Sequence, residues 1–124
     1  HLFLRLASRF PTEVVPGVTS MMCSASLLPR PLTLRDDVLS VIPGTLGEDA
    51  LVQALSHADA AVIMKLGQNL PKVRRAVIAA GLADRAWYVE RASMENQRVL
   101  PFAEAPETAP YFSQIVIPGE GLRR

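Results

Sequence analysis

Residues 38–81 read VLSVIPGTLGEDALVQALSHADAAVIMKLGQNLPKVRRAVIAAG, and this stretch decides the fold class. Two short apolar runs within it, at residues 38–42 and 60–64, have the length of buried strands. Each is followed by a segment of helical character, at residues 48–57 and 69–80, which begins and ends at suitable capping residues. Apolar strands that alternate with amphipathic helices are typical of α/β layers, in which helices cover both faces of a sheet.

The flanking sequence extends this pattern in both directions. Upstream, residues 13–15 (EVV) have strand character, and a small-residue helix is expected at residues 20–28, before Pro29. Further strands are expected downstream at residues 86–89, 97–102 and 112–117. Because the last two are joined without a helix, we expect an antiparallel edge. The prediction is an α/β fold with a mixed central sheet of about five strands flanked by helices, and residues 60–64 as a central strand buried on both faces.

The first ten residues, HLFLRLASRF, form an apolar, helix-compatible pattern that has no capping residue before it. Pro11 ends this pattern, because proline lacks the N–H group that a helix interior requires. We therefore expect the chain to be a fragment. Residues 1–10 are interpreted as the end of an N-terminal domain, and residues 11–124 as a single C-terminal domain.

The composition excludes several classes of function. The 13 basic and 12 acidic residues nearly cancel and form no long basic run, so no nucleic-acid partner is expected. The apolar stretches are too short for a membrane span. One cysteine and two histidines allow neither an intrachain disulfide nor a structural zinc site, and no metal site is expected. These features indicate a cytoplasmic domain.

Ligand sites in open α/β sheets lie in the loops beyond the carboxyl ends of the strands. Here those loops are residues 16–20, 43–46, 65–69 and 90–96. The first of them carries two hydroxyl residues, Thr19 and Ser20, at the expected start of a helix. Hydroxyls in that place either cap the helix or contact a polar group of a ligand.

Five segments in and beside these loops resemble the second domain of the tetrapyrrole methylases. They are VVPGVTS, LSVIPGT, AAVIMKLGQNLPKV, YVERASMENQRV and PYFSQIVIPG, and they occur in the order and spacing of that family. The MKLGQNLPKV and ERASMENQRV segments resemble the branch that methylates carbon 20 of precorrin-2 in cobalamin (vitamin B12) biosynthesis. The resemblance covers residues 11–119. It implies a methyltransferase that uses S-adenosyl-L-methionine.

The resemblance also implies which residues contact the cofactor. Thr19 and Ser20 match a family pair that binds S-adenosylmethionine, Met64 matches a residue beside the adenine, and Ala92 matches a small residue near the cofactor. Each has a plainer interpretation as a cap, as core packing or as a turn residue. The glycine-rich loop of the family's first domain has no counterpart here, so we expect half of a cofactor site and an inactive fragment.

Two cations, Lys65 and Arg91, follow expected strands and are candidates for binding the carboxylates of the substrate, precorrin-2 or cobalt-precorrin-2. The plainer alternative is that both are solvated strand-end charges. No catalytic acid or base is predicted, because the sulfonium of the cofactor is already a strong electrophile and the protein contributes mainly alignment and exclusion of water.

Two other interpretations remain open at this point. The chain is similar in pattern to other tetrapyrrole methylases and to the related diphthine synthase, which would change the substrate. Alternatively, it is a non-catalytic α/β domain whose apolar faces mediate dimerisation. A homodimer is expected in either case, because apolar residues such as Leu2, Leu4 and Leu6 lie outside the expected sheet.

Overall fold

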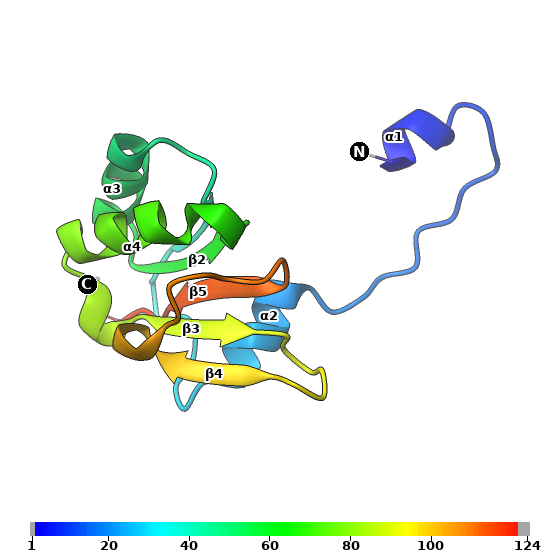
Figure 1. Ribbon diagram of the computed structural model, residues 1–124. Coiled ribbons are helices and arrows are strands. Elements are labelled where there is room, and N and C mark those ends of the chain that lie inside the picture. Colours follow the sequence, from blue (N-terminus) through cyan, green and yellow to red (C-terminus); the bar gives the residue numbers. More distant parts are fainter. Residues whose placement is uncertain (1, 122–124) are drawn as a thin grey trace.

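The computed structural model describes residues 2–121, which build a five-stranded mixed sheet with helices on both faces (Figure 1). The strands lie in the order β1-β2-β5-β3-β4. β1 and β2 are parallel, whereas β5 is antiparallel to both β2 and β3, and β4 is antiparallel to β3. The predicted α/β class, the mixed sheet and its antiparallel edge are confirmed. The strands are β1 (Leu39–Pro43), β2 (Ala60–Met64), β3 (Trp87–Glu90), β4 (Arg98–Pro101) and β5 (Ser113–Ile117).

Three helices pack on this sheet, and each starts within two residues of its predicted position. They are α2 (Ser20–Ser26), α3 (Glu48–Ser56) and α4 (Leu70–Ala79). A 3₁₀ turn (Gly67–Asn69) leads directly into α4, whose first turn holds Pro71, as its fixed φ favours. Gly81 follows α4 with φ +71°, a backbone conformation that glycine adopts without strain.

The first face of the sheet is closed by α3 and α4. Leu51 and Leu55 of α3 and Leu70 and Val73 of α4 are buried against the sheet. Strand residues alternate between the two faces, so this layer receives every second strand side chain. The strand side chains in this cluster include Ile42, Ala61, Ile63, Tyr88, Ile115 and Ile117.

The second face is covered by α2 and the segment that follows it. Leu28 packs there against Val62, Val89 and Val116. β2 is an interior strand, and its first four residues are fully buried, as predicted. The middle of the sheet is β5, however, and Met64 at the end of β2 is only half-buried.

The prediction of a strand at residues 13–15 is wrong. Residues 11–19 have no regular secondary structure, and Val14 and Val15 are 68% and 82% exposed. β-Branched residues favour a strand only where a neighbouring strand supplies hydrogen bonds and packing, and no strand within residues 2–121 pairs with Val14 or Val15. This segment leads from α1 (Leu2–Leu6), which lies away from the sheet and buries none of its residues (Figure 1).

The longest helix within residues 2–121, α4, has ten residues. None of the helices in that range combines the length and the apolar character that a membrane crossing requires.

Candidate functional site

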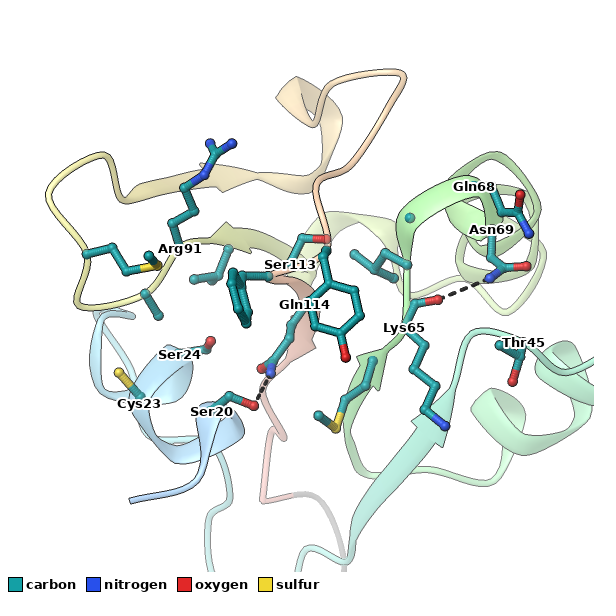
Figure 2. A pocket seen from close by; sticks show the side chains of 18 of the residues that line it. Ser20, Cys23, Ser24, Thr45, Lys65, Gln68, Asn69, Arg91, Ser113 and Gln114 are labelled. Atoms are coloured by element: carbon teal, nitrogen blue, oxygen red, sulfur yellow. Dashed lines mark hydrogen bonds between the residues drawn. The ribbon is translucent and has the colours of Figure 1, made fainter. Parts of the chain in front are cut away.

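A pocket of about 740 Å³ opens at one edge of the sheet (Figure 2). β1, β2 and β3 run in the same direction, because β2 and β3 are both antiparallel to β5, and all three end at this edge. Thr45, Lys65 and Arg91 follow these strands and line the pocket. All four loops predicted from the strand-end rule contribute to the lining, although the first of them follows no strand.

Five of the six candidate site residues line this one pocket: Ser20, Met64, Lys65, Arg91 and Ala92. Thr19 does not line it. Instead, Thr19 is the N-cap of α2, and its hydroxyl accepts a hydrogen bond of 3.4 Å from the backbone N–H of Met22. The plainer interpretation of Thr19, as a capping residue, therefore holds for its side chain.

The base of the pocket is apolar. Met64 ends β2, Val89 belongs to β3, and Ala92 lies in the loop after β3; all three pack in the cluster under α2. An apolar base with a few polar groups around it is typical of small-molecule sites, and the volume lies within their usual range.

Two loops at the pocket are fixed by residues in the left-handed region of backbone space. Lys65 has φ +58° and Arg91 has φ +51°, directly after β2 and β3. This conformation costs a residue other than glycine roughly 1 kcal/mol or more, so the surrounding structure must hold it. The Arg91 N–H donates to the carbonyl oxygen of Phe112 over 2.8 Å, and the Asn69 side chain donates to the Lys65 carbonyl oxygen over 3.1 Å.

A buried carboxylate anchors the loop after β3. Glu90 is 3% exposed and accepts hydrogen bonds from the Tyr88 hydroxyl over 2.6 Å and from Arg91 over 3.0 Å. Arg98 approaches the same carboxylate over 3.5 Å. Burial, followed by the hydrogen bond and the charge of Glu90, raises the pKa of the Tyr88 phenol well above its usual value. A charge buried in this way is stable only because several donors surround it.

The two candidate cations are in different states. The Arg91 guanidinium is paired with Glu90 and points away from Ser20 and Gln114 (Figure 2). Lys65 is exposed, and no carboxylate within residues 2–121 forms a salt bridge with its ammonium group. Among the residues that the structure describes, Lys65 therefore has no carboxylate partner, whereas Arg91 shares its charge with Glu90.

Sequence reasoning missed several lining residues, of which Gln114 is the most informative. Gln114 extends from β5 toward α2, and its Nε2 donates to the Ser20 hydroxyl oxygen over 2.6 Å (Figure 2). A polar residue inside the apolar run FSQIVI was the available signal. Other missed lining residues are Cys23, Ser24, Gln68, Asn69, Tyr111, Phe112 and Ser113.

No group of three or more histidine, cysteine, aspartate or glutamate side chains that could hold a metal ion occurs within the described part of the chain. The lining residues offer a binding surface of hydroxyls, three side-chain amides, the cations of Lys65 and Arg91, and an apolar base.

Comparison with known families accounts for this arrangement. Residues 1–106 match the tetrapyrrole (corrin/porphyrin) methylases. The chain belongs to this family.

Two curated relatives place the chain more closely among these methylases. It is 53% identical over 120 residues to the precorrin-2 C(20)-methyltransferase of a Sinorhizobium species. The aligned stretch covers 96% of this chain and 49% of the relative. It is also 50% identical over 125 residues to the cobalamin biosynthesis protein CobIJ of Mycobacterium bovis. That alignment covers all of this chain and 24% of the relative. The chain thus spans about half the length of the first relative and about a quarter of the second.

A solved structure shows the same fold. The uroporphyrin-III C-methyl transferase from Thermus thermophilus, whose crystal structure contains S-adenyl homocysteine, is 26% identical and aligns with a TM-score of 0.62. The alignment covers 97% of this chain and 57% of that chain.

Proposed function

We propose that this chain is one half of an S-adenosylmethionine-dependent methyltransferase that methylates carbon 20 of precorrin-2 in cobalamin biosynthesis. The observation that carries the proposal is the agreement of the pocket with the sequence similarity. Five of the six residues expected from the family resemblance line one pocket, and the chain is 53% identical to a precorrin-2 C(20)-methyltransferase. Relatives at this level of identity support the substrate class as well as the fold.

The residues of the pocket fit the proposed cofactor. Ser20 offers a hydrogen-bonding hydroxyl, and Met64, Val89 and Ala92 offer an apolar surface for a flat ring. The small side chain of Ala92 lets the loop after β3 approach a ligand closely. Thr19 would act indirectly: its hydroxyl accepts a hydrogen bond from the Met22 N–H and so holds the first turn of α2.

S-adenosylmethionine, when bound, supplies an electrophilic methyl group on a sulfonium. The chain's own residues then have to bind, orient and exclude water. Lys65 is proposed to bind a carboxylate of the tetrapyrrole, because its ammonium group is exposed at the pocket. Arg91 is proposed to bind a second carboxylate of the tetrapyrrole, more weakly than Lys65 does, because its guanidinium also pairs with Glu90. The transfer releases S-adenosylhomocysteine and one proton from carbon 20; the proton goes to water, and no side chain of the pocket is proposed as an acid or base.

We further propose that residues 1–10 are the end of a preceding domain and residues 11–124 are the C-terminal domain. Two observations support this division: α1 buries none of its residues, and the chain covers about half of the Sinorhizobium relative.

A homodimer in the cytoplasm is the proposed assembly, because the exposed apolar side chains Leu2, Phe3 and Leu4 favour self-association. Sedimentation velocity with the chain and with a Leu2→Ser/Leu4→Ser variant tests this point, and an unchanged sedimentation coefficient would contradict it.

The decisive test of the activity is a chimera in which this chain replaces the matching stretch of the Sinorhizobium relative. We expect it to transfer a methyl group from S-adenosylmethionine to precorrin-2 or to cobalt-precorrin-2, with the methylated carbon identified by NMR. The unmodified relative is the positive control. The 124-residue chain alone is expected to give no detectable turnover, because alignment needs both walls of the cleft, and a misplacement of about 1 Å costs on the order of a hundredfold in rate. A folded chimera without activity would contradict the proposed function.

A further inference from the structure

Two polar side chains lie in the most buried strand of the sheet, Ser113, whose hydroxyl donates to the Pro110 carbonyl oxygen over 2.6 Å, and Gln114. All five residues of β5 are buried, and Gln114 within it is 6% exposed. The three residues that follow it, Ile115 to Ile117, are apolar core residues. Burying an amide costs free energy unless its polar atoms are hydrogen-bonded, so a glutamine in this place calls for a reason other than packing.

The amide of Gln114 is hydrogen-bonded at one end only. Its Nε2 donates to Ser20 Oγ over 2.6 Å. Its Oε1 is the one buried side-chain oxygen or nitrogen, among the residues the structure describes, that has no hydrogen-bond partner. Both Gln114 and Ser20 line the pocket, and their bond joins the middle strand of the sheet to the first residue of α2 (Figure 2).

The direction of this hydrogen bond determines what Ser20 offers to a ligand. A serine hydroxyl has one hydrogen to donate and two lone pairs that accept. Because Ser20 Oγ accepts from Nε2, its own hydrogen is not used in this bond. That hydrogen remains available to a hydrogen-bond acceptor inside the pocket.

We infer that Gln114 is a positioning residue, which holds the Ser20 hydroxyl as a hydrogen-bond donor toward an acceptor group of the molecule that occupies the pocket. The inference rests on the proposed function, in which that molecule is S-adenosylmethionine, whose ribose and carboxylate oxygens are acceptors of the required kind. Gln114 is not among the residues that the resemblance relates to the cofactor, and its role is inferred from its hydrogen bond to Ser20, its burial and its unpaired oxygen.

The test separates positioning from packing with a Gln114→Met variant, since methionine has a similar shape but neither donates nor accepts as an amide does. The unfolding midpoint should not fall, because the substitution removes an unpaired buried atom together with the bond. The dissociation constant for S-adenosylhomocysteine, measured by calorimetric titration of the 124-residue chain, should rise about tenfold. Gln53→Met, on the exposed side of α3, is the matched control and should change neither quantity.

A double-mutant cycle with Ser20→Ala decides whether Gln114 acts through Ser20. We expect Ser20→Ala to weaken binding by about the same factor, and the double variant to be no weaker than either single variant. If the increases in the dissociation constant of the two single variants multiply in the double variant, Gln114 contacts the ligand itself, and the positioning role is overturned. An unchanged dissociation constant, or a clear fall of the unfolding midpoint, in Gln114→Met would also overturn it and leave the proposed function standing. Absence of any binding by the unmodified chain would overturn the positioning role, whereas the proposed function is decided separately by the activity of the chimera.

Discussion

The two faces of the sheet differ in how they are covered. α3 and α4 close one face, where Leu51, Leu70 and Tyr88 are fully buried. The other face is covered by the seven residues of α2 and the segment after it, and there the sheet edge is open as a pocket. The same strands supply both faces: Ile63 and Ile115 point to the closed one, and Met64 and Gln114 to the open one. The larger core cluster therefore lies in one layer, and the pocket opens in the other.

The largest effect on stability is expected on the closed face. Leu70→Ala removes a fully buried side chain at the start of α4 and should lower the free energy of unfolding by about 3 kcal/mol, from lost burial and the cavity left behind. Urea denaturation measures this loss. Ile78→Ala, on the same helix but 57% exposed, is the control and should cost far less. Equal losses for the two variants would show that the closed layer is not the main source of stability.

The opposite pattern is expected on the open face. Ala92→Leu places three extra carbon atoms at the pocket, where an open cavity accepts them, so the free energy of unfolding should change by less than about 1 kcal/mol. Binding of S-adenosylhomocysteine should weaken about tenfold or more, because the added side chain takes space that the ligand needs. Calorimetric titration tests this. Ala79→Leu, at the exposed end of α4, should leave binding intact.

Alkaline pH should weaken the closed face through Tyr88. Its pKa is raised in the folded protein, chiefly by burial, above the usual value of about 10. Above that pH the unfolded phenol loses its proton while the folded one keeps it, so the free energy of unfolding falls, by at most about 1.4 kcal/mol per pH unit. Between pH 9 and 11 we expect Tyr88→Phe to lose stability less steeply than the unmodified chain. Tyr111→Phe, at an 87% exposed side chain, should keep the steep slope; identical slopes in all three proteins would refute the assignment.

The smallest effect is expected at the surface ion pair between α3 and α4. Glu48 and Arg75 are 2.7 Å apart, and the Arg75 side chain is 60% exposed. Solvent screens such a pair strongly, so Glu48→Ala should leave the unfolding midpoint within experimental error. A clear loss that disappears at high salt would show that this pair contributes to the closed layer after all.

The sequence predicted best what local patterns determine. The alternation of apolar runs with helical segments located β1, β2, α3 and α4, because the spacing of their apolar residues agrees with their final environment. The strand-end rule located the pocket loops. It did not require knowledge of which strands are neighbours, because β1, β2 and β3 all end at the same edge.

What the sequence could not predict depends on contacts between distant segments. Val14 and Val15 have strand propensity, but no neighbouring strand in the described structure pairs with them. Gln114 and Ser20 are 94 positions apart, so only the placement of β5 in the middle of the sheet brings them together. The sequence also did not predict the ion pair between Arg91 and Glu90, because adjacent residues of a strand normally point to opposite faces. In the structure, Arg91 lies in a left-handed conformation directly after β3, and its guanidinium contacts the Glu90 carboxylate.

The most direct test of the division between the two faces is to map ligand binding residue by residue. Addition of S-adenosylhomocysteine to the ¹⁵N-labelled 124-residue chain should shift the backbone amide signals of Ser20, Met64, Ala92 and Gln114. Signals from α3 and from the outer side of α4, such as those of Leu51 and Ile78, should stay in place. Shifts confined to α3 and α4, or an unchanged spectrum at saturating ligand, would contradict the account.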